Sequence, residues 1–299
     1  MDKNKIIGIV SLASAAFLWG LWGVFARLLG LGFGVFYQVF SRCLILFLIL
    51  FGYLLLKRLW KRVDGADYKW FLGMSLSGLL STVCSFVAFN YLAIGITLFV
   101  FYAASTLGGY FLGSILFQER LTRIKIISLL VSFFGLFLIF STTFEQANLF
   151  YLLLSVLGGF GFAGWQVFSK KVSSKYSLFQ VSAIDNLIFS IVSLIFVVAF
   201  KETIILPSFS LIWLIVLLFA FTVLIASLFN IYGFRRLEAQ KGSLIMLLDP
   251  VFGVIFGWLF YKEVLTIYSL VGGAMILFGA ALPNLNFKKK TQLGSTNLC

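Results

Sequence analysis

Apolar residues along the chain form long runs rather than the alternating or striped patterns of a water-soluble domain. Each run is about as long as the roughly 17 to 25 apolar residues that a helix needs to cross a bilayer. The connections between runs are short, so no soluble domain is expected beside the bundle. The pattern predicts an all-α integral membrane protein with ten transmembrane helices, over residues 6–29, 33–56, 70–91, 96–117, 126–142, 149–168, 178–200, 211–234, 243–261 and 264–282.

The second half of the chain repeats the first. Seven residues recur 144 positions later: Gly109, Gly113, Glu119, Leu121, Thr122, Phe134 and Gly135 correspond to Gly253, Gly257, Glu263, Leu265, Thr266, Phe278 and Gly279. Residues 22–27 also resemble residues 165–170, at an offset of 143. We therefore expect two five-helix repeats, at residues 1–144 and 145–299, the second with a short basic tail. Two copies of an odd number of crossings are inverted in the membrane, an arrangement that is common in transporters.

Basic residues are concentrated in alternate connections between the runs. With the N-terminus inside, nineteen of the 23 Lys and Arg residues fall in cytoplasmic segments, whereas Arg27 and Arg42 lie within helices. Basic segments are retained on the cytoplasmic side during insertion, so both termini are predicted to be inside. The net charge of +13 therefore reflects topology and a lipid bilayer as partner, not nucleic acid, with anionic headgroups as secondary contacts. We expect a multi-pass protein of a bacterial cytoplasmic membrane.

The sequence lacks the residues that most enzymes and pumps require. It contains no histidine, no Gly-x-x-x-x-Gly-Lys phosphate loop and no nucleophile accompanied by a base. Cys43 and Cys84 lie inside predicted helices and Cys299 lies in the tail, without the spacing of a metal site or a disulfide framework. We therefore expect neither an enzyme nor an ATP-driven pump, and no cofactor or metal.

Arg42 is a charged residue inside the second predicted helix, and its repeat equivalent in the seventh helix is Asp185. A charge at the centre of a membrane helix costs roughly 2.5–3.5 kcal/mol on insertion scales, so such groups usually pair or face water. Two interpretations remain open. The residues contribute to a substrate site, either close together or on opposite sides of one cavity, or they form an ion pair that holds the two halves together.

Asp249 directly precedes Pro250 in the ninth predicted helix. Proline removes a backbone donor and weakens the helix in the turn before it. A carboxylate beside such a break can bind a cationic group of a substrate or carry a coupled proton. The alternative is a structural aspartate that accepts hydrogen bonds from backbone groups at the kink.

Other polar residues within helices complete the predicted substrate site: Trp19, Asn90, Tyr102, Ser105, Trp165, Asn186 and Asn230. Deep Trp and Tyr side chains can stack on rings or attract cations, although most residues of this kind serve packing. Glu119 and Glu263 end the fourth and ninth predicted helices. Each either satisfies backbone N–H groups at the start of the next helix or forms a gate contact that closes one face of the protein.

Several motifs occur in a fixed order along residues 7–283: Trp19-Gly20 in the first helix, the lone Arg42 in the second, the endings at Glu119 and Glu263, and a glycine-spaced tenth helix. In these features the chain resembles the drug/metabolite transporter superfamily, EamA type. The resemblance implies a ten-helix, inverted-repeat permease that works by alternating access. One departure is Thr106, which occupies the position of the usual proline in the fourth helix and matches Pro250 of the second half.

The preferred hypothesis is a secondary transporter for a small metabolite, an amino acid or a related zwitterionic or cationic compound, with a coupled proton as an option. Within the resembling superfamily, a carrier of S-adenosylmethionine or another ring-bearing cation is the main alternative. A membrane-embedded enzyme, a lipid scramblase or a non-transporting partner protein are the alternatives from other classes. Gly109-x-x-x-Gly113 and Gly253-x-x-x-Gly257 allow close helix approach, so a monomer and a homodimer are both compatible with the sequence.

Overall fold

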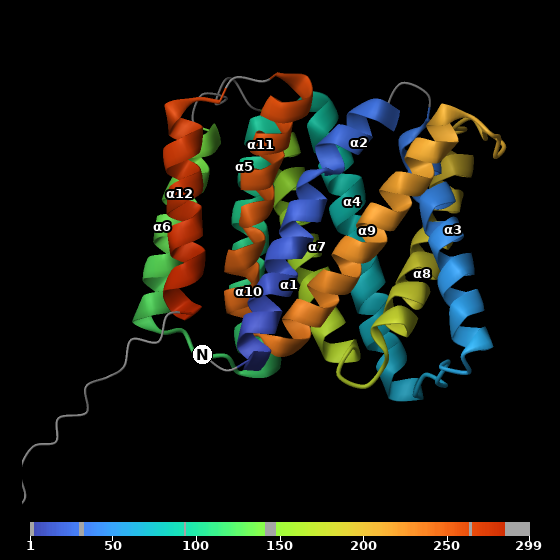
Figure 1. Cartoon of the computed structure of the whole chain (residues 1–299), viewed down its shortest axis with the longest axis horizontal. Coiled ribbons are helices and arrows are strands. Elements are labelled where there is room, and N and C mark those ends of the chain that lie inside the picture. Colours follow the sequence, from blue (N-terminus) through green and yellow to red (C-terminus); the bar gives the residue numbers. More distant parts are fainter. Residues whose placement is uncertain (1–2, 30–32, 93, 141–147, 263–264, 285–299) are drawn as a thin grey trace, which may run out of the picture.

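A computed structural model describes residues 3–29, 33–92, 94–140, 148–262 and 265–284; the side chains at 23, 26, 27, 86, 89, 90, 94–96 and 140 are outside this description. The described part is helical and contains no strand. Its α-helices are α1 (Lys3–Gly20), α2 (Trp22–Leu29), α3 (Val35–Leu56), α4 (Tyr68–Tyr91), α5 (Ile94–Phe117), α6 (Arg123–Phe140), α7 (Leu149–Val172), α8 (Leu178–Ala199), α9 (Leu211–Arg236), α10 (Ala239–Met246), α11 (Leu248–Tyr261) and α12 (Ile267–Ala281). The helices lie side by side, with the N-terminus at the lower edge of Figure 1.

Six of the described helical segments are long and apolar enough to cross a membrane: α3, Thr97–Phe117 of α5, α7, α8, α9 and the joined segment Ala239–Tyr261. Large apolar side chains on the outside of the bundle remain exposed, among them Phe111, Leu130 and Val198. Water-soluble proteins rarely expose so much contiguous apolar surface, whereas lipid chains cover it without penalty. The prediction of a multi-pass helical membrane protein is therefore confirmed. The number of crossings and their orientation stay predictions.

Two of the predicted helices are broken in the structure. The ninth, predicted over 243–261, begins earlier at Ala239 and is interrupted at Leu247, where the Leu247 N–H bonds the Leu244 carbonyl three residues back. Pro250 explains this break, because its ring displaces the carbonyl of Met246 and its nitrogen has no proton to donate. The first, predicted over 6–29 as one helix, is interrupted at Leu21 without any proline.

Helix α5 runs without interruption through Thr106. The hydroxyl of Thr106 donates to the carbonyl of Tyr102, four residues earlier, at 2.9 Å. Threonine keeps its backbone N–H, so the helix retains the hydrogen bond that Pro250 removes from the matching segment. The two halves therefore differ at this position, as the sequence predicted.

Helices from the two halves pack against one another throughout the bundle. Helix α3 lies against α8 and helix α6 against α12, at opposite edges of the view in Figure 1. Helix α4 packs on α7, and α1 packs on α9. Helix α5 also packs on α7, while α10 and α11 pack on α1. Glycines permit the closest crossings; a Cβ added at Gly135 of α6 would lie 2.6 Å from the carbonyl oxygen of Gly272 in α12.

The same backbone geometry recurs at helix ends in the two halves. Arg58 and Lys201 follow α3 and α8, and both have a φ of 53°. The N–H of the residue after each, Leu59 or Glu202, donates to the carbonyl five residues earlier, at 2.9 and 3.0 Å respectively. Gln118 (φ 52°) and Lys262 (φ 56°) likewise follow α5 and α11. The left-handed region is unfavourable for residues with a side chain, so its recurrence at offsets of 143 and 144 reflects matching local folds.

Candidate functional site

A buried carboxylate lies where α4, α7 and α8 meet. The indole Nε1 of Trp165 donates to Asp185 Oδ2 at 2.9 Å, and the hydroxyl of Ser75 donates to Asp185 Oδ1 at 2.7 Å. All three side chains are buried. Hydrogen bonds to both oxygens compensate the carboxylate for the loss of water. Sequence reasoning selected Trp165 and Asp185 but missed Ser75, because nothing in the pattern distinguishes this serine from the others in the helices.

Aromatic rings extend from this carboxylate across the centre of the bundle. The Trp19 ring lies 5.6 Å from that of Trp165 and 4.9 Å from that of Phe162, and the Phe162 ring lies 5.5 Å from that of Phe101. The Nε1 of Trp19 is buried and has no hydrogen-bond partner. A buried polar group without a partner is unusual in a folded protein and marks a position where a ligand can bond.

A second buried carboxylate lies at the other end of these rings. The hydroxyl of Tyr102 on α5 donates to Asp249 Oδ2 at 2.5 Å, and the Tyr102 ring lies 5.2 Å from that of Phe101. Asp249 occupies the first turn of α11, directly after the break at Leu247. We call the residues Trp19, Ser75, Phe101, Tyr102, Phe162, Trp165, Asp185 and Asp249 the aromatic–acid cluster. It contains five of the predicted site residues, contributed by both halves of the chain.

Arg42 forms an ion pair with neither carboxylate in the part of the chain that the structure describes. Its side chain is buried on α3, with the guanidinium carbon 5.0 Å from the centre of the Trp22 ring and 4.4 Å from that of Phe219. The ion pairs of the described residues include none between Arg42 and Asp185. Cation–π contacts with two rings therefore replace the direct pairing that the repeat equivalence of the two residues had suggested.

The contacts of the remaining predicted substrate residues do not join them to one another or to the cluster. Ser105 is buried on α5, and the Asn186 amide donates to the Ser182 carbonyl of its own helix at 2.8 Å. The amide of Asn230 on α9 donates to the sulfur of Met246 at 3.5 Å, at the end of α10, and its Oδ1 is buried without a partner. The side chain of Asn90 and the whole of Glu263 lie outside the described residues.

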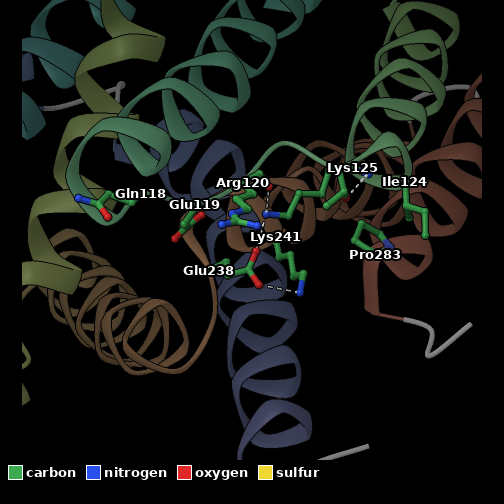
Figure 2. Close-up of a pocket in the computed structure, with 9 residues that line it drawn as sticks. Gln118, Glu119, Arg120, Ile124, Lys125, Glu238, Lys241 and Pro283 are labelled. Atoms are coloured by element: carbon green, nitrogen blue, oxygen red, sulfur yellow. Dashed lines mark hydrogen bonds and ion pairs between the residues drawn. The ribbon is translucent and has the colours of Figure 1, made fainter. Parts of the chain in front are cut away.

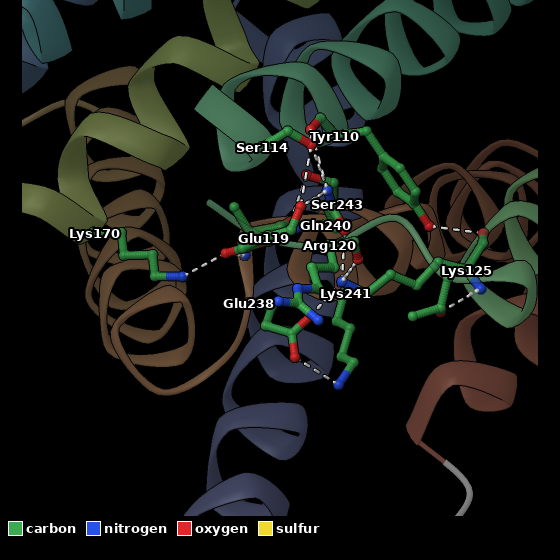
Figure 3. Close-up of polar contacts among 12 residues, drawn as sticks. Tyr110, Ser114, Glu119, Arg120, Lys125, Lys170, Glu238, Gln240, Lys241 and Ser243 are labelled. Atoms are coloured by element: carbon green, nitrogen blue, oxygen red, sulfur yellow. Dashed lines mark hydrogen bonds and ion pairs between the residues drawn. The ribbon is translucent and has the colours of Figure 1, made fainter. Parts of the chain in front are cut away.

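Glu119 joins three helix ends at the edge of the bundle where the N-terminus lies. Its Oε1 accepts from the Ala239 N–H at 2.6 Å and from Lys170 Nζ at 2.9 Å, and its Oε2 accepts from the Gln240 N–H at 3.0 Å (Figure 3). Glu119 thus satisfies the first turn of α10, from the opposite half of the chain. The expectation that Glu119 would satisfy the next helix is wrong, because α10 and not α6 presents its N-terminus to the carboxylate.

Further polar contacts surround Glu119. The amide of Gln240 donates to the carbonyl of Glu119 at 3.2 Å, and Lys125 Nζ donates to Gln240 Oε1 at 2.6 Å and pairs with Glu238 at 2.5 Å. Partial burial acts to raise the pKa of Glu238, but hydrogen bonds from Lys125 and Lys241 hold this pKa below its usual value. Glu119, Lys125 and Glu238 are among the residues that line an open depression of about 450 Å³. Figure 2 shows their side chains. We call Glu119, Lys125, Lys170, Glu238 and Gln240 the polar latch.

Comparisons with known proteins identify what the chain is similar to. A sequence model described as the EamA-like transporter family matches residues 6–141 and 149–285, which confirms the resemblance read from the motifs. An uncharacterized transporter of Archaeoglobus fulgidus is 24% identical over 235 residues, 78% of this chain and 83% of that protein. The uncharacterized transporter YoaV of Bacillus subtilis is 23% identical over 180 residues, 58% of this chain and 61% of that protein. A solved crystal structure shares the fold, with a TM-score of 0.76 and 17% identity over 94% of this chain and 96% of that chain.

Proposed function

The chain belongs to the EamA-like transporter family and is a membrane transporter, and on this premise we propose that it moves a small zwitterionic or cationic metabolite by alternating access. An amino acid or a related compound is the proposed substrate class. The transporter would work in a bacterial cytoplasmic membrane, as a monomer or a homodimer. Family membership favours transport over catalysis, and none of the described residues forms a group suited to hold a metal ion.

We propose that the helices make ten crossings, with both termini inside, as two inverted repeats. Joining α1 with α2 and α10 with α11 gives five rods in each half. Helix α4 packs on α7, and the equivalent helices α9 and α1 also pack on each other. Helix α5 packs on α7, and the equivalent rod of α10 and α11 likewise packs on α1. The other two main contacts, α3 with α8 and α6 with α12, each join equivalent helices. This is the pattern that a two-fold axis in the membrane plane produces.

Individual contacts support the same symmetry. Gly135 approaches Gly272, and the equivalent pair, Ser128 and Gly279, is also close: a Cβ added at Gly279 would lie 2.9 Å from the Ser128 carbonyl oxygen. Arg42 lies over the ring of Trp22, twenty residues earlier, and Asp185 bonds Trp165, also twenty residues earlier. A cation and an anion thus occupy matching positions, each against a tryptophan.

The aromatic–acid cluster is the observation that carries the proposed substrate class. Two buried carboxylates, Asp185 and Asp249, lie at the ends of one set of aromatic rings, and the Nε1 of Trp19 has no partner. Carboxylates and ring faces attract organic cations, most strongly where water is excluded. A break in the helix directly before Asp249 supplies backbone groups and a joint at the same place.

The polar latch is proposed as the gate on the cytoplasmic side. Glu119 ties the end of α5 to the end of α7 and the start of α10, and these helices carry Tyr102, Trp165 and, through α11, Asp249. Opening toward the cytoplasm would separate these helix ends and break the contacts of Glu119. The corresponding role of Glu263 at the outer face stays a prediction.

Ligand binding to purified variants tests this proposal. Thermal stabilisation by a panel of amino acids and amines should identify ligands for the wild type, because a ligand that binds only the folded protein stabilises it by an amount that grows with the ratio of ligand concentration to Kd. D185N and D249N should weaken binding of such a ligand about tenfold or more, whereas D64N, at an exposed carboxylate of the α3–α4 connection, should not. Unchanged binding by both variants of the cluster would contradict the site.

We also propose that Asp249 carries the proton that is coupled to substrate transport. In proteoliposomes, D249N should retain exchange of labelled for unlabelled substrate but lose accumulation driven by a pH gradient, because an amide cannot carry the proton. A D249N protein that still accumulates substrate in response to the gradient would place the coupling elsewhere.

A further inference from the structure

Arg42 is the buried cation for which the described structure supplies no anionic partner. Its side chain is only 5% exposed, within a helix long and apolar enough to cross the membrane. Its Nε is buried without a hydrogen-bond partner, and no ion pair of Arg42 occurs among the described residues. A guanidinium offers five donors, and neither the two ring contacts nor the neighbouring Cys43 thiol, a weak acceptor, supplies the anionic partner that they favour.

The carboxylates on or against the helices around Arg42 are engaged elsewhere. Asp185 accepts from Ser75 and Trp165 with its two oxygens, and Asp249 accepts from Tyr102. Glu202 accepts from the Phe36 and Tyr37 N–H groups at the start of α3. The carboxylates of the polar latch lie at helix ends and are held by the Ala239 N–H and by Lys125. A buried charge usually has a partner, since leaving it unpaired is strongly unfavourable. The unpaired state of Arg42 is therefore explained if the partner arrives with a ligand.

We propose that Arg42, whose guanidinium packs against the adjacent rings of Trp22 and Phe219, binds a carboxylate of the substrate. This inference rests on the proposed function and narrows its substrate class from zwitterionic or cationic metabolites to zwitterions that carry a carboxylate. The planar guanidinium matches a carboxylate with two parallel hydrogen bonds, and the flanking rings keep the fork in place and exclude water. Asp185 and Asp249 then remain for the cationic end of the same molecule.

Depth along the helices fits this division of charge. Arg42 lies seven residues after the start of α3, and Asp185 seven residues after the start of α8. At a rise of 1.5 Å per residue, each is roughly 10 Å from its own end of the bundle. Because α3 and α8 run in opposite directions in the proposed topology, Arg42 is nearer the outer face and Asp185 nearer the cytoplasm. A zwitterion would therefore bind with its carboxylate outward.

A binding assay with a minimal probe tests the assignment without requiring transport. The probe is phenylacetate, which combines a carboxylate with a ring, and phenylacetamide is the neutral control. Thermal midpoints are measured against probe concentration for the wild type, R42Q, R42K and R235Q. Arg235 is exposed at the end of α9, so R235Q removes a positive charge without touching the site. R42K keeps the charge but loses the planar fork, and it serves if R42Q does not fold.

We expect phenylacetate, but not phenylacetamide, to stabilise the wild type and R235Q, with a rise of about 2 °C or more near saturation. The apparent Kd should weaken at least tenfold in R42Q and several-fold in R42K. The assignment is overturned if phenylacetate stabilises none of the proteins, or if R42Q or R42K binds it as the wild type does. If the protein binds phenylacetate through Arg42 but exchanges no solute, the assignment of Arg42 stands and the proposed transport function is overturned. Exchange of an amino acid that is unaffected in R42Q would overturn the assignment of Arg42 and leave the transport proposal standing.

Discussion

Replacing Glu119 with alanine should release the side of the protein that we propose faces the cytoplasm. The carboxylate accepts two backbone N–H groups of α10, at 2.6 and 3.0 Å, and pairs with Lys170 at 2.9 Å. Loss of a helix cap costs about 1 kcal/mol, and loss of a largely buried ion pair about 1–2 kcal/mol more after allowance for the partial exposure of Lys170. The total of about 2–3 kcal/mol should raise the inward-open population roughly 30- to 140-fold.

Cysteine accessibility measures this change directly. Ser243 on α10 is 2% exposed, lies against Gly109 of α5 and bonds only its own helix, so a cysteine there should react when α5 and α10 separate. In a background without native cysteines, S243C/E119A should react with a cytoplasmic, membrane-impermeant maleimide tens of times faster than S243C alone. E119Q, which keeps one acceptor oxygen, should be intermediate, and D64N should have no effect. A labelling rate in S243C/E119A within twofold of S243C would refute the role of the latch.

Three further perturbations test other parts of the account. P250A should raise the thermal midpoint and slow substrate exchange, because alanine restores an N–H that can bond the Met246 carbonyl and so closes the helix break before Asp249. Faster exchange in P250A would contradict a role for this break in transport. G135V should destabilise the protein by about 1–3 kcal/mol, since its Cβ would meet the Gly272 carbonyl, whereas G52V in α3 meets nothing within 4 Å and should be nearly neutral; equal thermal midpoints would count against the α6–α12 crossing. Hydrogen bonds from Lys175 and Tyr176 lower the pKa of Asp67, in the connection between α3 and α4. The extra thermal stability of the wild type over D67N should therefore be full above pH 3.8, the usual pKa, and vanish as the pH falls through the lowered pKa; a difference that persists in acid would contradict this contact.

The sequence predicted the membrane class and the helical segments because the bilayer imposes a length and a composition on each helix. It also located the interruption near Asp249, since the effect of Pro250 on its own helix is local. It missed the interruption at Leu21, where no proline occurs and Gly20 instead packs closely on Phe252 of α11. A close approach between distant helices leaves no mark in the local pattern.

The candidate site was only partly predictable for the same reason. Charge at membrane depth singled out Arg42, Asp185 and Asp249, but not whether they meet one another. That depends on which helix faces lie inward, and the structure places Asp185 against Trp165 and Arg42 against Trp22 instead. In both halves of the sequence a tryptophan precedes the charged residue by twenty positions. This shared spacing would have suggested both contacts.

The latch was the least predictable part. Glu119 was expected at a helix end, but its acceptor role for α10 needs the two halves to be docked, which no local pattern encodes. Lys170 carried one usable signal, because its repeat equivalent is Arg27 and both follow a tryptophan by five residues. Basic residues in such positions were attributed to topology, with anionic lipid headgroups as secondary contacts, whereas the structure gives Lys170 a specific carboxylate.

Counterflow in proteoliposomes tests the central claim most directly. Purified protein is reconstituted with a high internal concentration of a ligand that stabilises it, and a trace of the same labelled ligand is added outside. The account predicts transient accumulation of label above equilibrium, which depends on the internal unlabelled ligand and is reduced in D185N. Entry of label no faster than in protein-free liposomes, for every ligand that binds, would contradict a transporter with its substrate site in the aromatic–acid cluster.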